Sequence, residues 1–146
     1  MNKFMLLLIL SMSASATENI PPKSSIRTQE VNDICTTKTS TIRNVPNSLK
    51  KEVYKRAGIA FGDRILCAKG YEVDHIISLQ LGGTNDISNL QLQAYCTKDQ
   101  LPPTFPKGVL YDARAKDSME THLHTDICHG RITPEQAQIK IYNWKN

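Results

Sequence analysis

The sequence predicts an α+β domain in which helices surround a small β element. Apolar residues recur at helical spacing over 112–128 and 133–144. Two short strand-like segments, at 71–77 and 89–92, precede these helical segments and are separated by a glycine-containing turn. With 146 residues, 40% of them hydrophobic and 22% charged, the chain is long enough for one globular domain and too apolar for a disordered protein.

Residues 1–16 are expected to be a secretory signal peptide and not part of the fold. Lys3 precedes an apolar run at 4–10, and Ala14-Ser15-Ala16 supplies the small residues of a cleavage site. The run is shorter than the roughly 18 residues that span a bilayer. An uncleaved anchor or a buried N-terminal helix is the alternative. Cleavage would release a secreted or periplasmic protein with no stable membrane association.

The expected export affects how the cysteines are interpreted. An even number of cysteines in a short exported chain favours disulfides, and a structural zinc site is the alternative. Zinc ligands usually come in close pairs, whereas the gaps here are 32, 29 and 32 residues. We therefore expect two disulfides, and the sequence leaves open the three ways of pairing Cys35, Cys67, Cys96 and Cys128.

The N-terminal part of the exported chain is expected to contain one helix. Residues 17–32 are polar with two adjacent prolines, which indicates a flexible lead-in. The threonine-rich segment 35–43 favours an extended conformation. Asn47 or Ser48 can then cap a helix that runs to about Ala57, because apolar residues recur there every four positions.

The rest of the chain is expected to form short strands and two helices. Short strands are expected at 65–67, 71–77 and 89–92, and the prolines and glycine of 97–109 exclude regular structure. The helix over 112–128 is expected to bury a stripe made of Ala115, Met119, Leu123 and Ile127.

The last helix has the clearest start signal in the chain. Thr133 is a good N-cap residue, Pro134 suits the first helical position, and Gln136 can close a capping box. This helix is expected to bury Ala137, Ile141 and Trp144.

Residues able to carry out chemistry are concentrated in the segment YEVDHIISLQLGGTNDISNLQLQ, residues 71–93. Asp74 offers a carboxylate for a hard divalent cation, and the imidazole of His75 can accept a proton near neutral pH. Gly82-Gly83 lets the chain turn back, so that Asn89 can return beside His75 and fix the backbone or the ring. A metal ion, an oriented base and basic flanking residues are the ingredients for phosphodiester hydrolysis.

This segment resembles the HNH nuclease motif in its Asp-His pair, its Gly-Gly loop and its Asn-Leu pair. Further matches resemble a secreted bacterial and phage subfamily over residues 33–144; they include 35–43, Lys116-Asp117, Glu120, Leu123-His124, Cys128, Gly130, Ala137-Gln138 and Trp144. The resemblance implies a ββα-metal (His-Me finger) core with additional flanking helices, and an HNH nuclease domain over residues 33–146.

The resemblance also implies a role for each site residue. His75 would be the general base that takes a proton from the attacking water, and Asn89 would orient it. Asp74 would bind the metal ion. The third signature position of the family, His or Asn, falls on Asp112 in this sequence, and Asp117 is the alternative third ligand.

Other polar residues are expected to have ordinary structural roles. Glu120 and His124 share a helix face with Asp117, and a face of this kind binds a metal or is simply solvated and paired. We favour a structural role for Glu120 and His124. The basic residues near the motif are each expected to be solvated: Lys50, Lys51, Lys55, Arg56, Arg114 and Lys116.

The preferred hypothesis is a secreted, metal-dependent endonuclease that hydrolyses phosphodiester bonds of DNA and acts as a monomer. Carboxylate ligands favour Mg²⁺ or Mn²⁺, with Zn²⁺ as the alternative. The net charge of +4 permits a polyanionic partner. The alternative is a non-catalytic secreted module with a degenerate HNH fold that binds nucleic acid or a surface polymer. The sequence decides neither between DNA and RNA nor between a toxin and a degradative enzyme.

Overall fold

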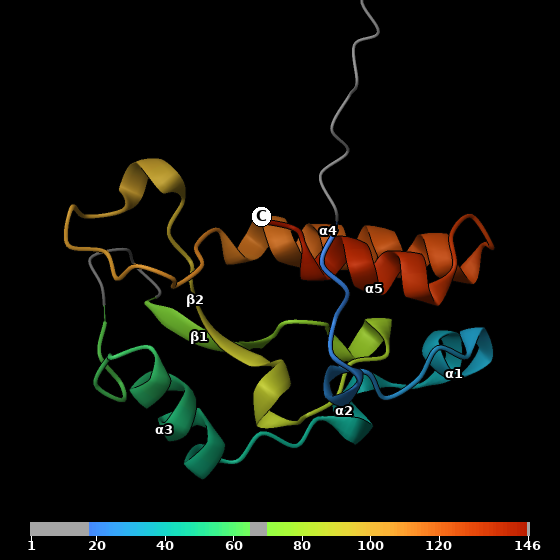
Figure 1. Ribbon diagram of the computed structural model, residues 1–146, viewed down its shortest axis with the longest axis horizontal. Coiled ribbons are helices and arrows are strands. Elements are labelled where there is room, and N and C mark those ends of the chain that lie inside the picture. The colour runs from blue at the N-terminus through green and yellow to red at the C-terminus, as the bar shows by residue number, and fades with distance from the viewer. Residues whose placement is uncertain (1–17, 65–69, 146) are drawn as a thin grey trace, which may run out of the picture.

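The computed structural model describes residues 18–64 and 70–145, and these form an α+β fold. The expected signal peptide, the expected strand at 65–67 and Cys67 lie outside the described residues. An antiparallel hairpin of β1 (Tyr71–His75) and β2 (Leu90–Ala94) is followed by α4 (Ala113–Cys128) and α5 (Pro134–Tyr142). Figure 1 shows α4 and α5 together on one side of the hairpin and α3 (Asn47–Arg56) on the other. This arrangement confirms the predicted fold class and is consistent with a ββα core.

The register of the hairpin determines which way the motif residues face. Asp74 pairs with Gln91, and His75 pairs with Leu90, the residue after Asn89. Side chains alternate between the two faces of a strand. Asp74 therefore faces one side of the hairpin with Glu72, while His75 faces the other.

The two glycines of the hairpin loop are required by close packing. Gly82 has a φ of +85°, and a Cβ atom there would lie 2.4 Å from the carbonyl oxygen of Thr28. A Cβ atom on Gly83 would lie 1.9 Å from the carbonyl oxygen of Ile77. Any larger residue would push the loop away from its neighbours, so these glycines shape the loop as the sequence predicts.

The N-terminal segment is helical and bound to the core. The prediction of an extended segment at 35–43 is wrong, because α1 (Val31–Thr36) and α2 (Thr39–Ile42) occupy this region. Burial of Ile34, which is 2% exposed, outweighs the weak extended preference of the threonines. Residues 18–30, expected to be a flexible lead-in, include backbone bonds from Arg27 and Thr28 to the Gly82 carbonyl at 2.7 and 3.2 Å.

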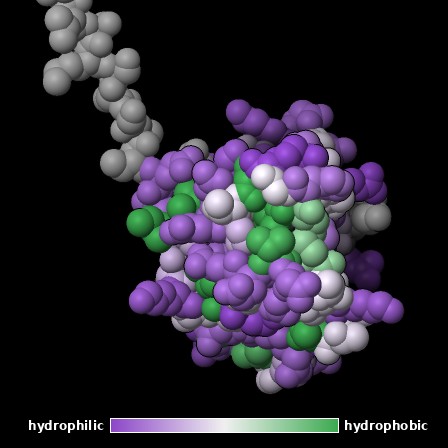
Figure 2. All heavy atoms as spheres, turned by 90° about the vertical axis from the view of Figure 1, so that its right-hand side faces the viewer, coloured by the Kyte–Doolittle hydropathy of each residue, from purple (hydrophilic) through white to green (hydrophobic). Residues whose placement is uncertain are grey.

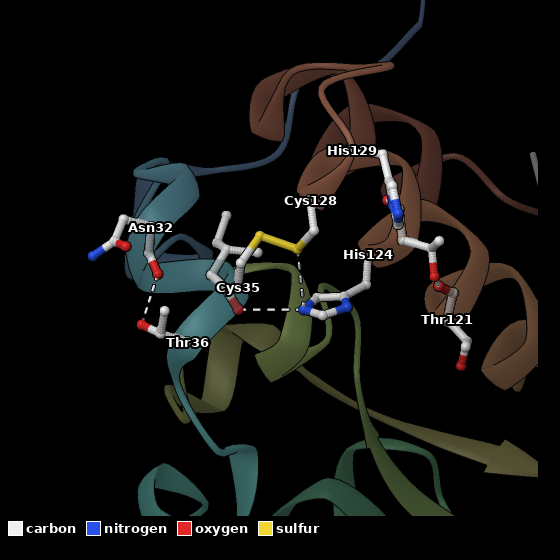
Figure 3. Close-up of a disulfide and its surroundings, with 9 residues drawn as sticks. Asn32, Cys35, Thr36, Thr121, His124, Cys128 and His129 are labelled. Carbon is white, nitrogen blue, oxygen red and sulfur yellow. Dashed lines mark hydrogen bonds between the residues drawn. A yellow bond between two sulfur atoms is a disulfide. The ribbon is translucent and has the colours of Figure 1, made fainter.

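A disulfide joins α1 to the end of α4. Cys35 and Cys128 are bonded with their Cα atoms 5.7 Å apart, which confirms one of the two predicted disulfides. Closing a loop with a sequence separation of 93 residues stabilises the fold by about 4–5 kcal/mol in the chain-entropy model. The ring of His124 lies beside this disulfide, with Nε2 3.3 Å from the Ile34 carbonyl oxygen (Figure 3), in keeping with a structural role.

Two hydrophobic clusters hold the elements together. One lies between α1, α4, α5 and the hairpin loop; its fully enclosed members include Ile77, Leu81, Ile127 and Ile141. The second packs α3 against the hairpin through Val53, Tyr54, Leu90, Leu92 and Val109. The HNH motif therefore lies between two separately packed groups of helices.

The helix ends agree with the sequence for α5 and differ for α3. Thr133 and Gln136 form the predicted capping box, with bonds of 2.9 and 3.1 Å. The N-cap of α3 is Pro46, and no side chain caps the helix, so the prediction of an Asn47 or Ser48 cap is wrong.

The buried face of α4 differs from the predicted apolar stripe. Leu123 and Ile127 are buried as expected, but Ala115 is exposed and Met119 is only partly buried. The first two turns bury Ala113, Lys116 and Glu120 instead. The prediction that Lys116 is solvated is wrong, since only 1% of this residue is exposed.

The surface is largely hydrophilic on the face that Figure 2 presents, with hydrophobic residues gathered in a band near its middle. The large hydrophobic residues that are exposed within the described ranges are Ile20, Val31 and Phe61. No helix among the residues that the structure describes is long and apolar enough to cross a membrane.

Candidate nuclease site

The imidazole of His75 is buried and held by a side-chain amide. His75 is the last residue of β1 and is 1% exposed. Its Nε2 lies 3.1 Å from Oδ1 of Asn85, a residue in the hairpin loop. The Nε2 edge of the buried ring therefore contacts a polar group, the side-chain amide of Asn85.

The other bonds of Asn85 determine which ring nitrogen of His75 carries the proton. Asn85 Nδ2 donates to the carbonyl oxygen of Ile42 at 2.7 Å, and Asn85 Oδ1 accepts from the backbone N–H of Asn44 at 3.1 Å. These backbone partners fix the orientation of the amide. Oδ1 can only accept, so Nε2 of His75 donates to it, and in the neutral ring Nδ1 carries the lone pair.

The surroundings of His75 favour the neutral imidazole. Burial lowers its pKa below the usual value near 6.5; the hydrogen bond that the ring donates to Asn85 opposes this, and the positive charge of Arg43 adds to the lowering. The ring is therefore neutral at pH 7. Nδ1 forms no hydrogen bond with a described residue, which leaves its lone pair available as a base.

Asn89 positions the backbone beside His75. Its side chain is fully buried; Oδ1 accepts from the Ile77 N–H at 2.9 Å, and Nδ2 donates to the carbonyl oxygens of Ile77 and Thr84 at 2.9 and 2.8 Å. Asn89 also accepts the Ile76 N–H on its own carbonyl at 2.7 Å. It thus closes the loop that follows His75, while the ring itself is held by Asn85.

On the opposite face of β1, Asp74 is paired with a buried lysine. Lys116 Nζ lies 2.6 Å from Asp74 Oδ2 and 2.7 Å from the His75 carbonyl oxygen, and it also forms an ion pair with Glu120. These three acceptors match the three N–H donors of an ammonium group. Lys116 therefore joins the end of β1 to α4.

More carboxylates surround this lysine than one cation can neutralise. Burial raises the pKa of Glu72 and of Asp117 above the usual value, and in both cases the negative charge of Asp74 adds to the increase. Glu72 also accepts a hydrogen bond from Tyr95. Asp117 is exposed, and no described residue forms an ion pair or a hydrogen bond with its carboxylate.

Asp112, the sequence candidate for the third site position, lies at the start of α4. It is the only described non-glycine residue with a positive φ, 64°, a conformation that aspartate tolerates better than most residues. Its Oδ2 lies 3.7 Å from Nζ of Lys145, at the end of the chain. Its carboxylate therefore has a different partner from that of Asp74.

A cavity of about 310 Å³ lies beside the residues that follow β1. It is lined by Arg43, which follows α2, and by Asp117 of α4; the remaining lining residues are Thr39, Ser78, Leu79, Gln80, Glu120 and Thr121. Ser78 is 6% exposed, and its Oγ forms no hydrogen bond with any residue that the structure describes. No group of three or more His, Cys, Asp or Glu residues in the described ranges is arranged to hold a metal ion by itself.

The motif predicts that Asn89 orients the ring of His75; in the structure Asn85 contacts the ring, and Asn89 closes the loop that follows His75. Residues 62–98 match the HNH endonuclease family. The matched segment contains both strands of the hairpin and ends before α4. Comparisons with curated proteins and with solved structures give no match. The HNH segment thus carries His75, Asn85 and Asn89, whereas α2 and α4 supply the rest of the site from outside it.

Two site residues, Asn85 and Lys116, were missed from the sequence. Asn85 stands in a Thr-Asn-Asp run that is also typical of an ordinary loop. Lys116 was predicted to be solvated because a charged residue is normally assigned to the exposed face of a helix. Its partner Asp74 lies on a strand 42 residues earlier in the sequence. Its position one turn after Asp112 and four residues before Glu120 was the available signal.

Proposed function

We propose that this protein is a secreted, divalent-metal-dependent endonuclease that hydrolyses phosphodiester bonds of DNA. The observation that carries the proposal is the imidazole of His75, neutral at pH 7 and fixed by Asn85 in an HNH segment. An oriented neutral imidazole is suited to the deprotonation of water.

In this proposal His75 acts as the general base. Nδ1 of His75 accepts a proton from a water molecule as the water oxygen attacks the phosphorus atom and the bond to the leaving oxygen breaks. The resulting imidazolium keeps its Nε2–H bond to Asn85 Oδ1, so the ring does not rotate during the transfer. Asn89 and Lys116 both hold the backbone at this point, through the Ile77 peptide and the His75 carbonyl respectively.

The donors near Asp74 fit a hard divalent cation. Asp74 Oδ1 accepts no hydrogen bond from a described residue, and Asp117 has a carboxylate without an ion-pair partner among them. Mg²⁺ is commonly bound by one or two carboxylates together with water and substrate phosphate, so a closed set of protein ligands is not required. When bound, such an ion would stabilise negative charge on the phosphate and the leaving oxygen.

Asp117 is the better second ligand in this geometry. Burial and the negative charge of Asp74 raise the pKa of Asp117, whereas the carboxylate of Asp112 forms an ion pair with Lys145. We therefore propose Asp74 and Asp117 as the residues that would hold the ion. The sequence prediction for Asp112 stays a prediction.

The charge distribution and the leader sequence support the substrate and the location. The chain has a net charge of +4, and α3 exposes Lys51, Lys55 and Arg56. Phosphate backbones bind such surfaces without sequence preference. We propose export on the basis of residues 1–16 and of the Cys35–Cys128 disulfide, since disulfides persist in oxidising compartments.

The proposal is tested with the purified exported chain and supercoiled plasmid. We expect conversion to nicked circles with Mg²⁺ or Mn²⁺, loss of nicking in excess EDTA, and recovery when the metal is added back. Agarose gel electrophoresis measures the conversion, and the His75→Ala protein purified in parallel controls for a contaminating nuclease. Binding of the plasmid without nicking under any metal would contradict the proposal and favour the non-catalytic binding module.

A second test separates the two candidate metal ligands. Titration calorimetry with Mn²⁺ and no DNA is expected to show binding weakened by about tenfold or more in Asp117→Asn and Asp74→Asn, since each loses a charged oxygen ligand. Asp112→Asn, which only loses its contact with Lys145, is expected to bind Mn²⁺ like the unmodified protein. Weaker Mn²⁺ binding by Asp112→Asn, together with unchanged binding by Asp117→Asn, would assign the role to Asp112.

A further inference from the structure

One basic residue of the site comes from α2, outside the HNH segment, and has no assigned role. Arg43 follows α2 and lines the cavity that also contains Asp117 and Ser78. It is exposed, and no described residue forms an ion pair or a hydrogen bond with its guanidinium group. The carboxylates in the same cavity are therefore not its partners.

The backbone that carries Arg43 is fixed to the same amide that fixes His75. Asn85 bonds the carbonyl of Ile42 and the N–H of Asn44, the residues immediately before and after Arg43. Nε2 of His75 and the N–H of Asn44 both lie 3.1 Å from Asn85 Oδ1, so these two nitrogens are at most 6.2 Å apart. A change in the position of Asn85 would displace both groups together.

The chemistry of this corner is that of a phosphate site. A guanidinium group offers planar pairs of N–H donors that match two oxygens of a phosphate. Arg43 supplies these donors in a cavity that is also lined by Asp117. An anion held by Arg43 would therefore lie in the same cavity as Asp117, one of the proposed cation ligands.

We propose that Arg43 binds a phosphate group of the nucleic-acid backbone beside His75 and places it for attack. The inference rests on the proposed function for the reaction, but the binding contact itself does not need cleavage. In this proposal the residue after α2, outside the HNH segment, supplies the cation that binds the phosphate.

The test compares Arg43→Ala with Lys38→Ala, which removes one positive charge from the same segment but not from the cavity. Both residues are exposed, and Arg43→Lys provides a variant that keeps the charge and loses the planar donors. We expect plasmid nicking by Arg43→Ala to fall by about 100-fold in kcat/KM. Lys38→Ala is expected to stay within about twofold, and Arg43→Lys to recover part of the loss.

A binding measurement keeps this inference separate from the proposed function. Fluorescence anisotropy of a short DNA duplex, in EDTA and at fixed salt, is expected to show binding several-fold weaker for Arg43→Ala than for Lys38→Ala. If the unmodified protein fails to nick plasmid but this difference is present, the proposed reaction is wrong and the phosphate contact stands. Equal nicking and equal binding of the two alanine variants would overturn the role of Arg43.

Discussion

Replacing His75 with alanine is expected to reduce plasmid nicking by about 100- to 10,000-fold, the usual contribution of a positioned general base. In the proposed mechanism the variant lacks the Nδ1 lone pair that accepts the proton of water, whereas the basic surface proposed to bind phosphate is unchanged. Binding of duplex DNA in EDTA is therefore expected to persist. Gel-based nicking rates and anisotropy measure the two properties on the same preparations.

The control for this prediction is His129→Ala. His129 is exposed near the end of α4, so its replacement removes an imidazole without touching the site. Because His75 is buried, thermal unfolding of the His75→Ala protein has to show that it is folded, and His75→Gln offers a second variant that keeps more of the side-chain volume. Nicking by folded His75→Ala at the unmodified rate would remove His75 from the mechanism.

The pH dependence of nicking follows from the same histidine. Its pKa in the folded protein is lowered, chiefly by burial, and only the neutral ring can accept a proton. The rate is therefore expected to hold down to a pH below about 6.5 and to fall at lower pH as the ring becomes protonated. A rate that already falls above pH 7 would show that His75 is not in the environment described here.

The parts of the fold that the sequence predicted well are those set by local rules. The capping box of Thr133 and Gln136 depends on residues three apart, and the Gly82-Gly83 loop depends on residues that flank a short hairpin. Asp74, His75 and Asn89 were selected from the sequence because the motif keeps them close together, and their roles stay predictions. Local sequence patterns such as the capping box and the Gly-Gly loop therefore predict the structure of their own segments well.

The parts that were missed depend on contacts between distant segments. Asn85 has its role through Ile42, 43 residues earlier, and the helices there were themselves predicted as extended. Threonine propensity is weak, and a single buried residue such as Ile34 can override it. Lys116 was missed for a related reason, since a charged residue fills a core position only when its partners are brought to it by the fold.

Replacing Lys116 with methionine is expected to lower the free energy of unfolding by about 3–5 kcal/mol. The methionine fills a similar volume, but it leaves the carboxylates of Asp74 and Glu120 without their cation in a part of the protein where Glu120 is 6% exposed. Denaturation by urea measures the change, without a reducing agent so that the disulfide stays intact. Arg114→Met is the control: it removes an exposed base from the same helix and is expected to change stability by less than about 0.5 kcal/mol.

The cause of that loss can be tested by removing the second charge. In Lys116→Met/Glu120→Gln the buried carboxylate of Glu120 becomes neutral, so the double variant is expected to be more stable than Lys116→Met alone. Lowering the pH should have the same effect, because burial already raises the pKa of Glu120 and an uncompensated Glu120 is protonated more readily still. The deficit of Lys116→Met relative to the unmodified protein is therefore expected to shrink between pH 7 and pH 5. A deficit that is the same at both pH values, and is not reduced by Glu120→Gln, would mean that Lys116 stabilises the fold by packing and not by its charge.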